Sequence, residues 1–133
     1  MAEDRLGPQR IQGAYAWRKL INAGVRLAGG SDFPVELPNP FLGLYAAVTR
    51  QDREGRPPGG WYPQEKLTRE EALRLFTTDA AYAAHMEHAT GSLEPGMWAD
   101  FIVVDRDYFK MPESEIDDIK VIATYVAGRK VSG

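Results

Sequence analysis

The sequence predicts an α/β fold that is mostly helical to about residue 88 and β-rich after residue 91. In the first part, apolar residues recur at helical spacing, and helix-capping side chains precede two of the segments. In the second part, the runs "DFIVVD" (residues 100–105) and "VIATYVAGRKV" (residues 121–131) are rich in β-branched and aromatic residues, which favours strands.

The first segments along the chain read as helix, strand and helix. Residues 11–23 place Ile11, Tyr15, Leu20 and Ile21 at near-helical spacing, and Gly24 is a plausible stop. Residues 25–29, "VRLAG", predict a short strand. The next helix begins with Asn39 as N-cap and Pro40 at its first position, where the missing N–H costs nothing. This order is typical of α/β units.

Two more helices are predicted before the β-rich part. The segment "LTREEALRLF" begins with the capping box of Thr68 and Glu71, ahead of an apolar stripe. Residues 78–89 predict a further short helix. Pro95 and Gly96 then occupy the central positions of a type II turn, and residues 121–131 predict a second late strand with a tight turn at Gly128.

Composition excludes several classes of protein. The 133 residues are the size of one domain or of a piece of one, and the net charge of −3, with both signs mixed along the chain, argues against nucleic acid or an anionic membrane as partner. The absence of cysteine excludes disulfides and thiolate metal sites. No signal peptide and no apolar run of membrane-spanning length is present, so we expect a cytoplasmic protein.

Five segments resemble, in order and at the right spacing, the C-terminal part of the metal-dependent amidohydrolase superfamily. The resemblance is to amidohydrolase family 3, the group of YtcJ-like and AepA-like proteins. A motif such as "GSD" occurs widely, whereas the ordered set is specific. The segments are "LINAGVRLAGGSDFPVE", "NPFLGLYAAVTRQD", "LTREEALRLFTTDAAYAA", "GSLEPGMWADFIVVDRD" and "VIATYVAGRKV".

The resemblance implies a fold of which this chain is the C-terminal fragment. It implies a distorted (β/α)8 barrel, which takes roughly 250 residues, and a small β-sandwich built from both ends of the chain. Residues 1–90 would be the end of the barrel, with 25–29 as its eighth strand, and 91–133 the C-terminal share of the sandwich. The missing remainder would explain why strand 25–29 has no partner nearby and why two late strands make a marginal sheet. Trp98 and Phe101 would belong to the sandwich core.

The resemblance also implies a role for Asp32, in the stretch "GGSD". In these enzymes the aspartate after the eighth strand contacts the catalytic metal, zinc or another divalent ion, and takes a proton from the attacking water. The HxH motif of the first strand and the ligands of the later strands have no counterpart here. Because a catalytic zinc usually needs three protein ligands, we expect the chain alone to be inactive and to hold no metal. The alternative for Asp32 is a turn residue whose carboxylate bonds nearby backbone N–H groups.

Five other residues are candidates for a site. Trp61 and Tyr62 lie in a loop rich in glycine and proline, where they either line a substrate pocket or anchor the loop. Arg50 either steadies an anionic group of the substrate or is a cation at a helix C-terminus. His85 and His88 would share a helix face as a metal pair, but their spacing is not that of the HExxH peptidases, and solvated histidines at a helix end are favoured.

The expected function is that of part of a metal-dependent amidohydrolase, which hydrolyses a non-peptide C–N bond in a small amide or cyclic amide. One alternative is a non-catalytic module that binds a partner or dimerises through exposed strand edges. Another is that a second polypeptide supplies the missing ligands. In isolation we expect a homo-oligomer, with or without exchanged segments, because surfaces made to face the rest of a barrel would be apolar and wet.

Overall fold

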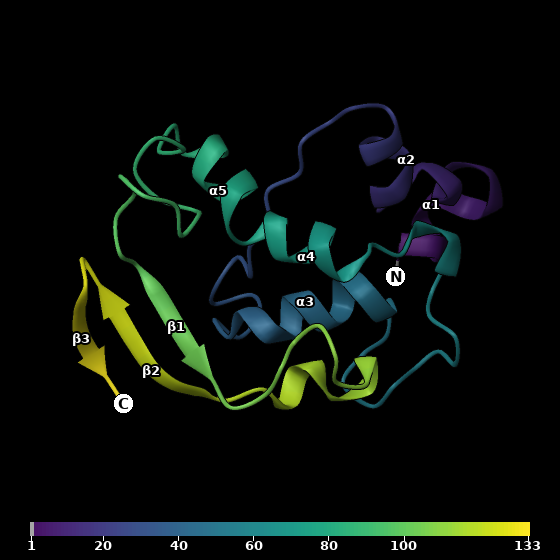
Figure 1. The fold of residues 1–133 in the computed structure, drawn as a ribbon. Helices are drawn as coiled ribbons and strands as arrows, with labels where there is room; N and C mark the ends of the chain where they lie inside the picture. Colours follow the sequence, from purple (N-terminus) through teal and green to yellow (C-terminus); the bar gives the residue numbers. More distant parts are fainter. Residues whose placement is uncertain (1) are drawn as a thin grey trace.

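A computed structural model describes residues 2–133. Within these residues the α-helices precede the strands, the 3₁₀-helix η3 lies between β1 and β2, and Figure 1 shows the sheet at one side of the helices. The α-helices are α1 (Ala2–Arg10), α2 (Trp17–Asn22), α3 (Pro40–Thr49), α4 (Arg69–Leu75) and α5 (Thr78–Ala83). The 3₁₀-helices are η1 (Ile11–Gly13), η2 (Pro63–Glu65) and η3 (Glu113–Asp118). The strands are β1 (Phe101–Val104), β2 (Val121–Val126) and β3 (Arg129–Ser132).

The strands form an antiparallel sheet in the order β1-β2-β3. Phe101 of β1 lies opposite Tyr125 of β2, and their stacked ring centroids are 4.5 Å apart. The segment 121–131 proves to be a hairpin of two strands, β2 and β3, rather than one strand. Its turn lies at Ala127 and Gly128, which both have positive φ, as a two-residue turn of this kind requires. The tight turn predicted at Gly128 is confirmed.

The predicted strand at residues 25–29 is not formed. The segment has no regular secondary structure, because a strand needs a neighbour that completes its hydrogen-bond ladder, and within residues 2–133 no strand pairs with it. One backbone bond, from Gly29 N–H to Leu75 O at 2.9 Å, joins it to α4. The predicted helix over 11–23 is likewise broken into η1 and α2, with Tyr15 at a positive φ between them.

The local signals that the sequence predicts for the other helices and turns are present. The Asn39 side chain accepts a hydrogen bond from Phe41 N–H at 3.1 Å, and Thr68 and Glu71 form the capping box of α4. Gly96 has φ +96°, and the turn that contains it closes with the hydrogen bond from Met97 N–H to Glu94 O. Helix α5 is shorter than predicted, because the chain leaves the helical region before residue 85.

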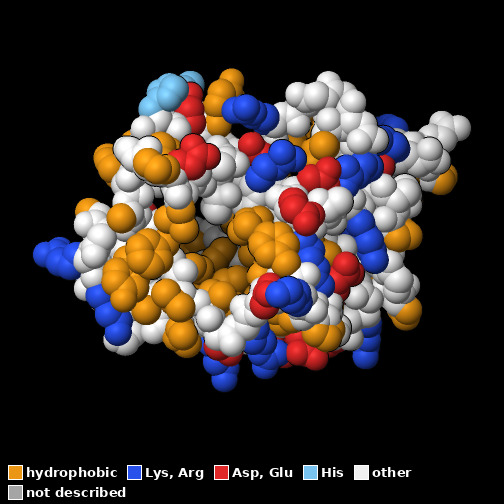
Figure 2. All heavy atoms as spheres, in the orientation of Figure 1, with side chains coloured by type: hydrophobic (Ala, Val, Ile, Leu, Met, Phe, Trp, Pro, Cys, Tyr) orange, Lys and Arg blue, Asp and Glu red, His pale blue; other side chains and the backbone are white. Residues whose placement is uncertain are grey.

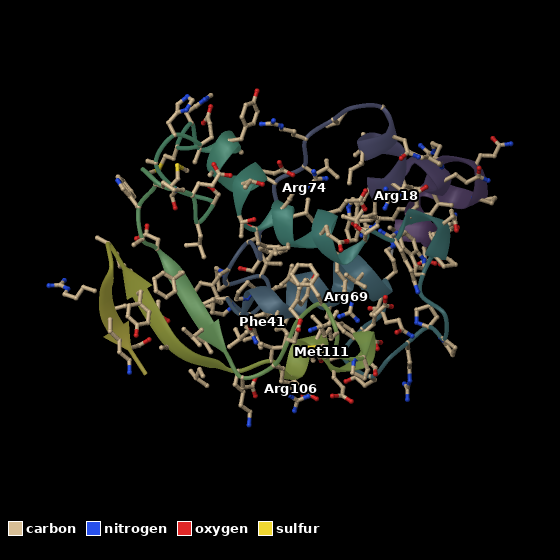
Figure 3. All side chains as sticks on the ribbon, viewed as in Figure 1. Arg18, Phe41, Arg69, Arg74, Arg106 and Met111 are labelled. Atoms are coloured by element: carbon tan, nitrogen blue, oxygen red, sulfur yellow. The ribbon has the colours of Figure 1, made fainter. Side chains whose placement is uncertain are left out.

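The hydrophobic core forms around α3, which lies between α4 and η3 (Figure 1). Arg69 ties α4 to the segment after β1, since its Nη1 donates to Tyr108 O and its Nη2 donates to Met111 O at 2.5 Å; Figure 3 shows Arg69 and Met111 close together. The core therefore takes residues from both sides of residue 90. Its buried members are Phe41, Leu44, Tyr45, Ala47, Val48, Leu67, Ala72, Leu75, Tyr108, Ile116 and Ile119.

The sheet, by contrast, exposes apolar side chains. Trp98, which the resemblance places in a core, is 52% exposed, and Phe101 is half-buried. The reason is that no second sheet covers the three strands within the described residues 2–133. In Figure 2, hydrophobic side chains gather around a hollow between the sheet and the helices. No helix in the described part of the chain is both long and apolar enough to cross a bilayer.

The ion pair between Glu71 and Arg18 predicts an acid-dependent stability. Arg18 donates through Nη1 to Glu71 Oε1 at 2.6 Å and through Nη2 to Oε2, and these bonds are the largest cause that lowers the pKa of Glu71 to about 2. The carboxylate therefore contributes stability above its ordinary pKa near 4.5, and the contribution is lost as the pH falls from there towards 2. Urea unfolding across this window should show a shallower pH dependence for Glu71→Gln, which keeps the capping pattern.

The exposed Glu94 supplies the matched control for this prediction, because it has no ion-pair partner among the described residues. Glu94→Gln should leave the pH dependence as it is in the unaltered chain. An equal slope for the two variants would contradict the role of the Arg18 pair.

Candidate functional site

The largest hollow lined by candidate site residues is a pocket of about 1140 Å³, here called the Arg50 pocket. Its wall consists of residues 27–31, both ends of α3, the turn at 50–54, Trp61 and Phe76, with the side chains of Tyr15 and Trp17 at one end. This size matches the cavities that hold small organic ligands. The pocket is therefore built from segments far apart in the sequence that meet around α3.

Arg50 is held rigidly at the wall of this pocket. It caps α3 in the left-handed conformation, with φ 59°, and is 6% exposed. Its Nε donates to Trp61 O and its Nη1 to Tyr15 O, both at 2.9 Å. The guanidinium carbon lies 4.4 Å from the ring centroid of Trp17 and 4.9 Å from that of Trp61, which are cation–π distances. Arg50 thus fastens the loop after α3 to the segment before α2.

One nitrogen of this guanidinium lacks a partner. Nη2 of Arg50 is buried and donates to no acceptor within residues 2–133. Burial is the largest cause that lowers the pKa of Arg50, and the negative charge of Glu65 opposes this effect. An unpaired buried donor costs about 1–3 kcal/mol, and more when it is charged. Arg50 is therefore more than a solvated cation at a helix end.

Trp61 combines the two roles that its loop position allows. It lines the Arg50 pocket, and it also anchors the loop, since its backbone N–H donates to Arg50 O at 2.8 Å. Its ring packs edge-on against Tyr15 and Tyr62, at centroid distances of 5.8 and 4.6 Å. Its indole Nε1 donates to Glu3 Oε1 at 3.0 Å. Tyr62 contacts Trp61 but is not part of the pocket wall.

Asp32 lies beside the pocket rather than in it. Its neighbour Ser31 is part of the wall, whereas Asp32 is exposed in a turn closed by the bond from Val35 N–H to Asp32 O at 2.8 Å. Asp32 has φ 52°, which aspartate tolerates better than most residues. Asp32 is thus a turn residue, but no described residue donates a hydrogen bond to its carboxylate, so the expected bonds from nearby backbone N–H groups are not seen. The structure therefore brings Arg50 and Trp61 together but keeps Asp32 outside their pocket.

Close packing on Phe76 fixes the segment that carries Asp32. A Cβ atom on Gly29 would lie 2.9 Å from Phe76 Cε2, and one on Gly43 would lie 2.4 Å from Phe76 Cζ. Only glycine lets this segment and α3 approach the ring so closely. Gly43→Ala is therefore expected to cost about 1–3 kcal/mol of unfolding free energy through overpacking.

Denaturant unfolding of two variants tests this packing. Gly30→Ala is the matched control, because a Cβ on Gly30 would meet nothing within 4 Å and its φ is not positive. We expect it to unfold within about 0.5 kcal/mol of the unaltered chain. Equal unfolding free energies for the two variants would show that α3 is not closely packed against the Phe76 ring.

The described residues do not form a complete metal site. Within residues 2–133 no group of three or more His, Asp or Glu side chains is arranged to hold a metal ion. Asp32 is free to supply one ligand. His85 and His88 are exposed, lie beyond the end of α5 and are thus not a pair on a helix face; His88 Nε2 is 3.9 Å from Glu87 Oε1. The described residues therefore do not supply all the ligands that a catalytic metal needs.

The sequence did not point to two members of this region. Glu65 is buried in η2, and its Oε2 accepts from Lys19 N–H at 3.2 Å. The ring of Trp17 lies against the guanidinium of Arg50. Neither residue stands in a recognisable motif. Glu65 stands in a polar stretch, and Trp17 lies 33 positions before Arg50. Only contacts between residues distant in sequence show that both belong to this region.

Comparisons with known proteins address the family directly. The family model described as "Amidohydrolase family" matches residues 1–132. The putative amidohydrolase YtcJ of Bacillus subtilis is 34% identical over 128 residues, which are 96% of this chain and 24% of that protein. The N-substituted formamide deformylase of Arthrobacter pascens is 35% identical over 111 residues, which are 84% of this chain and 20% of that protein.

A solved structure agrees with the sequence matches. An uncharacterized metal-dependent hydrolase from Pyrococcus furiosus superposes with a TM-score of 0.62 at 35% identity, over 78% of this chain and 20% of that one. The chain spans between 20% and 25% of the length of the curated relatives it matches. Because the family model extends along nearly the whole sequence, and a solved hydrolase shares its fold, this chain belongs to the amidohydrolase family.

Proposed function

We propose that this chain is the C-terminal portion of a metal-dependent amidohydrolase that hydrolyses a non-peptide C–N bond in an amide or cyclic amide. The observation that carries the proposal is the family match along residues 1–132. A relative named as an N-substituted formamide deformylase supports a C–N bond as the bond broken. A structural relative named as a metal-dependent hydrolase supports a divalent metal in the complete enzyme.

In this proposal Asp32 is the general base. Its carboxylate takes a proton from the water that attacks the carbonyl carbon, and returns it to the nitrogen as the C–N bond breaks. Two features of the residue support this role: its carboxylate is exposed, and no described residue occupies it with a hydrogen bond. Its position follows the segment that Gly29 fastens to α4.

The rest of the enzyme would supply what the described residues lack. Asp32 is the one proposed ligand on this chain, so the chain alone is expected to be inactive. Residues 1–90 would complete the barrel and 91–133 would join a β-sandwich. The exposed apolar side chains of the sheet support a covering layer; they include Trp98, Ile102, Ile122, Val126 and Val131.

Amine release from N-substituted formamides and from cyclic amides tests the proposed function. The complete enzyme, supplied with a divalent metal, should release amine or open the ring, and prior removal of the metal with a chelator should abolish the reaction. The 133-residue chain should stay at the uncatalysed rate under the same conditions. A complete enzyme that cleaves no amide with any metal would overturn the proposal.

A non-catalytic interaction module is the second candidate, and the exposed apolar face of the sheet favours it. In that case the chain would self-associate or bind a partner through the sheet without any hydrolase activity. Light scattering over a range of concentrations measures self-association of the chain. If the chain self-associates and the longer protein also shows no hydrolase activity, the module is favoured.

A further inference from the structure

We propose that Arg50 and Trp61 form a subsite for a carboxylate group on the substrate. The inference rests on the proposed function for calling the ligand a substrate, whereas the subsite itself lies wholly on this chain. It narrows the substrate class to an amide or cyclic amide that also carries a carboxylate.

The unused donor capacity of Arg50 is the first argument. Two of its nitrogens are committed to the carbonyls of Trp61 and Tyr15, so the plane of the guanidinium is fixed before any ligand arrives. Nη2 is buried without a partner and belongs to a side chain that is 6% exposed at the pocket wall. A carboxylate is the group that best satisfies such a donor, because charge-assisted bonds to arginine are stronger than neutral ones.

A protein carboxylate already lies at the other donor of the subsite, the indole N–H of Trp61. Glu3 Oε1 accepts from Trp61 Nε1 at 3.0 Å, and Glu3 is part of the pocket wall. Helix α1, which carries Glu3, has no buried residue. The contact is therefore easily displaced, and it shows that the indole N–H is directed towards a position that a carboxylate oxygen can occupy.

An anion in the pocket is attracted by the buried cation Arg50 more strongly than it is repelled by the exposed acids at the edge. The acidic side chains of Glu36, Asp52 and Glu54 also line the pocket, but all three are exposed, so water and salt screen them. The charge of Arg50 is largely screened from water by the two indole rings. A ligand anion that reaches Nη2 therefore meets one strong charge of opposite sign.

Because Nη2 is buried, a ligand reaches it only if a neighbouring side chain moves, and the Trp61 ring is one of the two that lie against the guanidinium. The backbone of Trp61 is held by two hydrogen bonds to Arg50, so the loop can stay in place while the side chain rotates. The hydrogen bond from its indole Nε1 to Glu3 Oε1 is the one that the ring would have to give up. Loss of this bond should consequently make ligand binding easier.

Benzoate is a suitable probe, with benzamide as the neutral molecule of the same shape. Titration of the 133-residue chain is followed by the indole N–H signals of Trp61 and Trp17 in two-dimensional NMR, and Trp98, which is not in the pocket wall, is the internal reference. We expect benzoate to shift the Trp61 signal and to bind at least about tenfold more tightly than benzamide. Arg50→Lys, which keeps the charge but loses the planar fork, should remove most of this preference.

Glu3→Ala keeps the test decisive if the Arg50 variant fails to fold. Removal of the Glu3 carboxylate should tighten benzoate binding about threefold or more, whereas Glu94→Ala, which removes an equal charge away from the pocket, should not. Equal affinity for benzoate and benzamide, or equal effects of the two alanine variants, would overturn the subsite. Since no hydrolysis is measured, either result leaves the proposed enzyme activity to its own assay.

Discussion

Asp32→Asn in the complete enzyme is expected to lower kcat by at least about 100-fold, because a positioned general base contributes roughly 10² to 10⁴ in rate. Asparagine has nearly the same shape but cannot take the proton of the attacking water. Asp32 is exposed, its carboxylate accepts no hydrogen bond from the described residues, and asparagine also tolerates its positive φ. The free energy of unfolding should therefore change by less than about 0.5 kcal/mol.

Steady-state kinetics on the substrate found by amine release measures this effect. Asp118→Asn is the matched control, because Asp118 is exposed at the end of η3 and does not line the Arg50 pocket. It should leave kcat as in the unaltered enzyme. An Asp32→Asn enzyme that keeps most of its kcat would exclude Asp32 as the base, and a large loss of stability would indicate a structural role instead.

Ile116→Ala is expected to have the largest effect on stability, about 2–5 kcal/mol. Ile116 is 0% exposed and is the largest fully buried side chain of the described residues. It lies in η3, which packs directly against α3, so a cavity there lies between two elements and cannot close without moving one of them. The cost combines the lost burial of the side chain with the cavity it leaves.

Ile122→Ala makes the same chemical change on the sheet, where Ile122 is 52% exposed. Equilibrium unfolding in urea should show a loss of about 1 kcal/mol or less for this control. Similar losses for the two variants would mean that the contact between η3 and α3 does not hold the core together. If Ile116→Ala does not fold, Ile116→Val, with an expected cost of about 0.5–1.5 kcal/mol, gives the same comparison.

Local rules predicted the parts of the fold that depend on a few neighbouring residues. The cap at Asn39, the capping box of Thr68 and the turn at Gly96 each need only residues within four positions of one another. The strand expected at residues 25–29 depends instead on a neighbouring strand, and the described residues supply none. The apolar run at these residues therefore forms no regular secondary structure, and the predicted strand is wrong for the described chain.

The candidate site shows the same division. The sequence named Arg50 and Trp61 as candidates because of a helix end and a loop rich in glycine and proline. It could not show that Tyr15, 35 residues before Arg50, accepts a hydrogen bond from its guanidinium. Nor could it show that Asp32 lies outside the pocket that Arg50 lines. Contacts between distant segments decide which candidates meet, and those contacts follow no local pattern.

The packing of η3 against α3 also determines when the core can form during synthesis of the chain. Residues 113–118, which cover α3, are synthesised more than sixty residues after it. Until then the part of the apolar face of α3 that they cover is open in a nascent chain, and such surfaces invite aggregation or binding by a chaperone. Completing the core around α3 therefore closes a loop of more than sixty residues, which costs chain entropy and slows folding.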